Sequence, residues 1–197
     1  MSAYGDATRI STRSGITYAD LGLADEAALA SLVDDLNEQA SETIDLYCGR
    51  DFGLHDAVTE KHDGNGRERI RLDGYPIISV TSVTLGGTTL TEDTDYAILD
   101  DVGILERIDY GVWTAGKRNL TVVYSYGYSA APGAIVGIVE DLVAGALTHA
   151  ARNRAVKGAS SMSMDGYSVA YSELSRLMVL APEQMQVLDR YRAAGAA

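Results

Sequence analysis

Polar side chains whose types could bind a metal ion gather between residues 55 and 65. They are His55, Asp56, Glu60, His62, Asp63 and Asn65. Imidazole and carboxylate groups ligate zinc and calcium, but this spacing matches no zinc signature. A calcium loop would need a third ligand pair and a distal glutamate, which the segment lacks. Because Asp63-Gly64-Asn65-Gly66 is typical of a tight turn, we expect a hairpin between strands over 58–62 and 67–72, and no metal site.

The other groups that could catalyse a reaction are dispersed along the chain. It has three histidines and one cysteine, and neither a phosphate-binding loop nor a nucleophile elbow. Cys48 ends a helical pattern and His149 stands alone on another, which is typical of packing residues. Adjacent carboxylates such as Asp34-Asp35 and Asp100-Asp101 point apart on a helix or strand. We therefore expect no enzyme activity, no catalytic residue and no cofactor.

Composition and charge limit the possible partners. The chain has 197 residues, 46% of them hydrophobic, so a domain with a sizeable core is expected. Its formal net charge of −12 repels nucleic-acid phosphate, which disfavours DNA binding. Lysine occurs only at Lys61, Lys117 and Lys157, which favours a protein from a halophilic host over an ordinary acidic protein. Because no run of about 18 apolar residues occurs, no membrane span is expected.

Three helices are expected to supply most of the core. The first spans about 25–47, with apolar residues at three- and four-residue steps and Gly49 as its stop. The second, over about 133–156, begins after a proline and is apolar on a broad face, so it is the expected centre of the helical core. The third spans about 182–192. Residues 1–15 contain few large apolar side chains and are expected to form an arm that only a partner orders.

Between the long helices lies a series of short β-branched and aromatic runs, separated by Gly, Asp and Asn. The expected strands are Arg69–Leu72, Ile77–Leu85, Tyr96–Leu99, Ile104–Ile108 and Leu120–Tyr126. The alternation slips near Thr81-Ser82, where a bulge is expected. We therefore predict an α+β fold: an α-helical bundle of two long helices plus a C-terminal helix, with an inserted antiparallel β-module and extended terminal arms. The predicted domains are 1–157, with the insertion at about 57–128, and 158–197.

Aromatic residues of the β-module could pack in its core or against another subunit. Trp113 lies in a loop, where it either covers the apolar face of the sheet or anchors an interface. Tyr124, Tyr126 and Tyr128 share one parity of a strand and should face the same way. Such a row could also stack on single-stranded nucleic acid, but no basic residue accompanies it. These four aromatic residues are our candidates for a subunit interface.

Residues 158–172 are small and polar, and as a free loop they would be long for a compact domain. We expect a partner to order this segment, with methionine and tyrosine side chains as anchors. Together with one face of the final helix, the candidates for this contact are Met162, Met164, Tyr167, Tyr171, Met185, Leu188 and Tyr191.

Several motifs of the β-module resemble those of a known family in order and spacing. They are LDGYPIISVTSV at 72–83, Asp95-Tyr96, Gly103-Ile104-Leu105, Trp113, NLTVVY at 119–124, Gly127-Tyr128 and Pro132. The family is the head–tail connector proteins, also called adaptor or head-completion proteins, of tailed viruses with long non-contractile tails. The similarity extends more weakly into the helices on both sides.

This resemblance implies a structural protein of the virion neck, made in the host cytoplasm. Members of the family form a twelve-fold ring beneath the portal and connect it to the next neck or tail component. Viral DNA passes through the lumen of the ring, here without specific binding. The C-terminal region of family members reaches into the portal, which agrees with the seven contact candidates of the C-terminal segment.

A different class of neck or tail protein remains as an alternative. A tail terminator, a stopper or another tail-side interaction protein would also fit flexible arms and a β-module. Such proteins are usually mostly β, so the order of helix, β-insertion and helix favours the adaptor.

Overall fold

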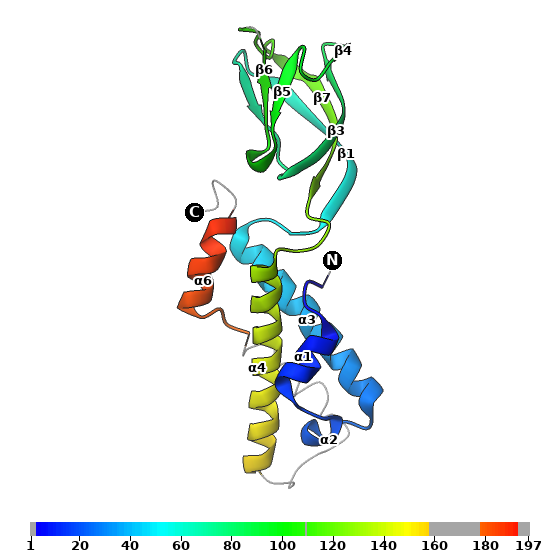
Figure 1. The fold of residues 1–197 in the computed structure, drawn as a ribbon, viewed down its shortest axis with the longest axis vertical. Coiled ribbons are helices and arrows are strands. Elements are labelled where there is room, and N and C mark those ends of the chain that lie inside the picture. The colour runs from blue at the N-terminus through cyan, green and yellow to red at the C-terminus, as the bar shows by residue number, and fades with distance from the viewer. Residues whose placement is uncertain (1–2, 109, 158–177, 193–197) are drawn as a thin grey trace. The chain divides into compact units, whose positions relative to one another are not determined.

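The computed structural model describes residues 3–108, 110–157 and 178–192, without the side chains of 155–157. The chain forms two compact units, which we call the helical unit and the β-unit (Figure 1). The helical unit is built from the chain before Phe52 and after Ala130, and the β-unit from the segment between them. The predicted α+β fold is thereby confirmed, with antiparallel strands inserted between the two long helices.

Two long helices, α3 (Glu26–Cys48) and α4 (Gly133–Lys157), form the centre of the helical unit. Local signals fix the ends of α3. The Asp25 side chain accepts a hydrogen bond from the Ala28 amide at 2.9 Å, and Gly49 adopts the left-handed conformation with φ of 67°. Both helices begin and end within one residue of the predicted positions.

Among the described helices of its unit, α4 contacts α1, α2, α3 and α6. By length and composition alone, its stretch Gly133–Arg154 is apolar enough to cross a membrane, which the sequence analysis did not anticipate. Half of the most apolar 18-residue window in this stretch is buried. A core helix surrounded by other helices passes the same test, so the apolar composition is explained by packing.

The N-terminal residues form a docked helix instead of the arm that we expected. Helix α1 (Ala7–Ser14) is capped by Asp6, whose carboxylate accepts the Arg9 amide at 2.9 Å. Ile10 is completely buried, and α1 packs against α3 and α4. A single buried isoleucine therefore anchors the helix, and a short turn, α2 (Tyr18–Leu21), leads from it towards α3.

Buried amide hydrogen bonds hold the chain before α1 against α3. The Asn37 side chain is 3% exposed, and its Oδ1 accepts the Gly5 amide at 3.0 Å. Its Nδ2 donates to the Gly5 carbonyl at 2.7 Å. The backbone amide of Tyr4 donates to Ser41 Oγ, also at 3.0 Å. These bonds satisfy polar groups that burial would otherwise leave unpaired.

The described end of the chain also belongs to the helical unit. Helix α6 (Pro182–Leu188) and the 3-10 turn η2 (Asp189–Tyr191) follow one another, and α6 contacts α3 and α4. Leu188 is fully buried there. The final helix therefore packs on the core of the helical unit, whereas the predicted boundary at residue 158 borders residues outside the described chain and stays a prediction.

The β-unit consists of two antiparallel sheets (Figure 1). The first has the strand order β1-β7-β3-β4, with bounds Leu54–Gly64, Gly116–Gly127, Ile77–Leu85 and Thr88–Leu90. The second has the order β2-β6-β5, with bounds Arg69–Arg71, Ile104–Arg107 and Tyr96–Leu99. A 3-10 turn, η1 (Asp100–Val102), joins β5 to β6.

The predicted hairpin around Asp63–Gly66 is wrong, although a turn is present. Strand β1 pairs with β7, and β2 pairs with β6 in the other sheet. Gly64 is needed for a different reason, because a Cβ at this position would lie 1.9 Å from the backbone oxygen of Thr114. The bulge expected in β3 is confirmed by a shift of register between Val80 and Ser82.

Candidate interaction surfaces

Trp113 occupies the core of the β-unit. Its side chain has no exposed surface, and its indole nitrogen donates to the Leu105 carbonyl at 3.3 Å. The guanidinium carbon of Arg107 lies 5.6 Å from the centre of the ring, on the distance scale of a cation–π contact. A fully buried side chain has no area to offer a neighbouring subunit, so of the two alternatives the structure supports the core position.

The three tyrosines of β7 differ in exposure. Tyr124 is fully buried, whereas Tyr126 and Tyr128 are half-buried. The rings of Tyr124 and Tyr126 stack with centres 5.4 Å apart, and Tyr126 also stacks on His55 at 4.6 Å. The expectation that they face the same way is confirmed for this pair. Because Tyr124 has no exposed surface, it cannot contact another subunit. An interface role for Tyr126 and Tyr128 stays a prediction.

A polar cluster lies around the Tyr124 hydroxyl. This group donates to Glu60 Oε1 at 2.6 Å and accepts the Gly74 amide at 2.9 Å. The other carboxylate oxygen of Glu60 contacts His62 Nε2 at 2.7 Å and accepts the Asp73 amide at 3.3 Å. Burial by itself raises the pKa of Glu60, but the hydrogen bonds from His62, Tyr124 and Asp73 outweigh it and lower that pKa.

Two of the candidate metal ligands considered from the sequence, Glu60 and His62, lie together in this cluster. Oxygen and nitrogen atoms of Glu60, His62 and Asp73 lie within 4.8 Å of one another, a distance at which they could hold a cation. The hydrogen bonds within the cluster account for the arrangement of Glu60 and His62 without one. Asp73, the third member, was not among the residues singled out from the sequence.

The contact between His62 and Glu60 should make the stability of the β-unit depend on pH. The hydrogen bond to Glu60, helped by the nearby carboxylates and opposed by burial, raises the pKa of His62 above its ordinary 6.5. A histidine whose pKa is raised on folding stabilises the folded state fully below pH 6.5. This stabilisation is lost as the pH rises through the folded-state pKa of the histidine. The fluorescence of the single tryptophan reports unfolding of the β-unit. We expect the denaturant concentration at the midpoint to fall as the pH rises from 6.5 through the folded-state pKa of His62.

His62→Gln should flatten this fall, because glutamine carries no titrating group. The matched control is His149→Gln, which removes a histidine from the helical unit and should leave the fall unchanged. An equal fall in wild type and His62→Gln would contradict the assignment.

Cys48 is buried at the end of α3, as expected for a packing residue. Burial, followed by the charge of Asp45, raises the pKa of its thiol to about 11. The sulfur lies 3.9 Å from the Leu188 carbonyl of α6. A thiol with this pKa is protonated at neutral pH and is a poor nucleophile.

Only part of the candidate partner-contact set lies in the described chain. Met162, Met164, Tyr167 and Tyr171 fall outside the described residues. Leu188 is fully buried against its own unit and cannot contact a partner as it stands, whereas Met185 and Tyr191 are half-buried. Tyr47 of α3 fixes this end of the chain by donating from its hydroxyl to Asp189 at 2.8 Å.

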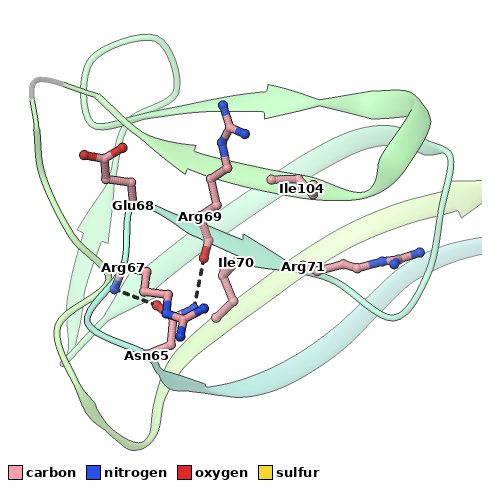
Figure 2. Close-up of a pocket in the computed structure, with 7 residues that line it drawn as sticks. All are labelled: Asn65, Arg67, Glu68, Arg69, Ile70, Arg71 and Ile104. Carbon is pink, nitrogen blue, oxygen red and sulfur yellow. Dashed lines mark hydrogen bonds between the residues drawn. The ribbon is translucent and has the colours of Figure 1, made fainter. Parts of the chain in front are cut away.

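A shallow groove of about 610 Å³ follows β2, the edge strand of the second sheet (Figure 2). Its lining residues are Asn65, Arg67, Glu68, Arg69, Ile70, Arg71 and Ile104. Three exposed arginines therefore line one groove, two on β2 and one just before it, in a chain with net charge −12. This patch was not predicted from the sequence, although Arg69 and Arg71 alternate in a strand and so share one face.

Comparison with known families identifies the class of protein. The model of the head completion protein family matches residues 16–194, so the chain belongs to this family. The match covers both the helical unit and the inserted β-unit. It confirms the resemblance found in the motifs between Leu72 and Pro132.

Solved structures that resemble the chain come from gene transfer agent (GTA) particles. One is described as the neck of an empty GTA particle computed with C6 symmetry, with a TM-score of 0.54, 14% identity, and coverage of 100% of this chain and 95% of that chain. Another belongs to the virion of a native gene transfer agent (GTA) particle, with a TM-score of 0.49, 13% identity, and coverage of 98% and 94%. No curated protein sequence matches the chain.

Proposed function

We propose that this protein is a head–tail adaptor, in which twelve copies form a ring between the portal and the next neck or tail component. The observation that carries the proposal is the family match over residues 16–194, which includes both units. The ring, the number of copies and the two neighbours are implied by the resemblance to head–tail connector proteins. The chain has no catalytic task in this proposal.

The charge of the chain supports a passive role towards the viral genome. DNA passes through the lumen of the ring, and a protein with net charge −12 offers little electrostatic attraction to phosphate. The C-terminal segment after Lys157 contacts the portal in this proposal, through its methionine and tyrosine side chains. The helical unit favours the adaptor over a tail terminator or stopper, because those proteins are usually mostly β.

The ring should assemble more readily as the salt concentration rises. Copies of a chain with net charge −12 repel one another across a Debye length of about 30 Å at 0.01 M salt. At 1 M salt this length is about 3 Å, so only direct contacts are felt and apolar burial can dominate. We expect sedimentation velocity of the purified chain between 0.05 M and 3 M salt to show a shift from monomer to ring.

The measurement also separates the two parts of the proposal. A ring that forms equally at every salt concentration would contradict the salt dependence, and with it the inferred halophilic host. A chain that stays monomeric throughout the range, and is absent from the neck in images of the virion, would contradict the adaptor itself.

A further inference from the structure

The two edges of the second sheet carry opposite charge. Strand β2 lies at one edge and carries Arg69 and Arg71, and Arg67 lies two residues before the strand; we call these three residues the arginine edge. Strand β5 lies at the other edge. Exposed carboxylates precede and follow it in the chain, with Glu92 forming a bridge to Tyr96 of β5 and Asp100 and Asp101 lying in the turn η1. We call these residues the acidic edge: Glu92, Asp93, Asp100 and Asp101.

The arginine edge has two cations without an ion pair in the described chain. Arg69 is paired, since its Nε lies 2.8 Å from Glu106 Oε1 of β6. Among the described residues, no ion pair involves Arg67 or Arg71. The guanidinium carbon of Arg71 lies 5.2 Å from the centre of the Tyr75 ring, where the ring limits its movement.

The backbone of this edge is partly covered, as Figure 2 shows. Asn65 Oδ1 accepts the Arg67 amide at 2.9 Å, and Asn65 Nδ2 donates to the Arg69 carbonyl, also at 2.9 Å. The Asn65 amide thus takes the place that the backbone of an added strand would occupy. Such protection disfavours recognition by strand addition and leaves the arginine side chains as the recognition element.

The acidic edge also has carboxylates that its own fold does not use. Asp95 holds the turn before β5, because its Oδ2 accepts the Thr91 amide at 2.8 Å. Glu92 and Asp101 are exposed, and no ion pair involves them within the described part of the chain. The β2 edge and the segments at the ends of β5 therefore carry charges of opposite sign that make no ion pair within the described part of the chain.

The direction of the strands suits contact between copies related by rotation. Strand β2 runs antiparallel to β6, and β6 runs antiparallel to β5, so β2 and β5 run parallel. A rotation axis along the strands keeps this direction from copy to copy. The β5 edge of one copy can then face the β2 edge of the next at every step, which is the heterologous contact that closes a ring.

We propose that the acidic edge of one copy docks against the arginine edge of the neighbouring copy, through side-chain ion pairs. This inference rests on the proposed ring, for which it names the contact between β-units. A second copy fits better than nucleic acid, because Glu68 lines the same groove and would repel phosphate. Long-range repulsion between copies is screened by salt before contacts a few ångströms long are lost.

Charge reversal at each edge provides the test, by sedimentation velocity at a salt concentration where the wild-type ring forms. The first variant is Arg67→Glu with Arg71→Glu, and the second is Glu92→Lys with Asp101→Lys. Facing like charges should lower the association constant of each variant by at least about tenfold. Lys61→Glu with Lys117→Glu, two exposed lysines of the β-unit, is the control with the charge change of the first variant.

The second variant separates edge pairing from simple repulsion. Each acid-to-lysine change adds two charges, so its formal net charge is −8 instead of −12. If overall repulsion governed assembly, this variant would assemble better than wild type, whereas edge pairing predicts that it assembles worse. An equimolar mixture of the two variants should form rings again, because each reversed edge then meets an edge of opposite sign.

Each outcome has a distinct meaning. If both variants form rings as readily as the wild type, or if the mixed variants form none, the edge contact is overturned and the adaptor proposal stays intact. Wild-type protein that forms no ring would contradict the adaptor proposal itself. The first variant could also form normal rings but lose a binding to labelled oligonucleotide that the wild type shows. That result would assign the arginine edge to nucleic acid and would also overturn the inference.

Discussion

Trp113→Ala is expected to lower the free energy of unfolding of the β-unit by about 3–5 kcal/mol, the usual cost of removing a buried large aromatic side chain. The residue has no exposed surface and lies among buried apolar side chains of both sheets. Its replacement also removes the indole hydrogen bond to Leu105 and the ring beside Arg107. Since a domain is stable by only about 5–15 kcal/mol, this loss is a large share of the stability of the unit.

The β-unit alone should be followed in this experiment, because a chain of two units need not unfold in one step. Hydrogen exchange of backbone amides, read by mass spectrometry, reports β3 and β7 separately from the helices. The matched control is Tyr110→Ala, an aromatic residue three positions away whose exposed fraction is 95%. It should change stability by less than about 0.5 kcal/mol. Equal protection of β7 in the two variants would contradict the core position of Trp113.

The second large effect is expected in the helical unit, where Arg13→Ala should cost about 2–3 kcal/mol. Glu140 of α4 is 2% exposed, and its Oε2 lies 3.2 Å from Arg13 of α1. The more distant Arg9 is 3.9 Å away, and Glu140 Oε1 has no hydrogen-bond partner among the described residues. Removing Arg13 therefore leaves a buried carboxylate with little compensation. The arginine side chain is 44% exposed, which keeps the cost below that of a fully buried pair.

A double-mutant cycle tests this pairing. Adding Glu140→Gln to Arg13→Ala should recover part of the loss, because the buried group is then neutral. Arg152→Ala, an exposed arginine at the other end of α4, is the control and should change stability by less than about 0.5 kcal/mol. Denaturation measured by circular dichroism at the helix band gives the free energy of unfolding of Arg13→Ala, Glu140→Gln, the double variant and the control. Independent, additive effects of the two changes would show that α1 is held by other contacts.

Elements whose signals are local could be predicted from the sequence. The cap Asp25 and the stop Gly49 define α3, and the β-branched run Ile77–Leu85 is β3 without any change of bounds. Helix α1 carries signals of the same kind, with Asp6 before it and Gly15 after it. It was missed because only one of its side chains, Ile10, is buried, so no apolar period marks it.

Features that depend on pairing across long stretches of sequence could not be predicted. The turn around Gly64 has the composition of a hairpin, but strand β1 finds its partner in β7, with His62 opposite Leu120. The cluster of Glu60, His62 and Tyr124 exists only because of that pairing. Whether Trp113 lies in the core or at an interface also depends on sheet packing, which sequence alternation does not specify.

The insertion of the β-unit into the helical unit sets an order of events during synthesis on the ribosome. The β-unit starts and ends at neighbouring points, since Leu54 pairs with Gly127 and the Tyr128 amide reaches the Gly53 carbonyl at 3.4 Å. It can therefore close while the chain is still growing. Helix α3 emerges earlier, but α4, against which it packs, follows the whole insertion.

At about 5–20 residues per second, the insertion delays α4 by on the order of ten seconds. During that time the apolar face of α3, which includes Leu32, Leu36 and Ile44, has no α4 to cover it. The β-unit is thus the first part of the nascent chain that can reach its final form. The helical unit is completed last, and chaperones that bind exposed apolar helices have this interval in which to act.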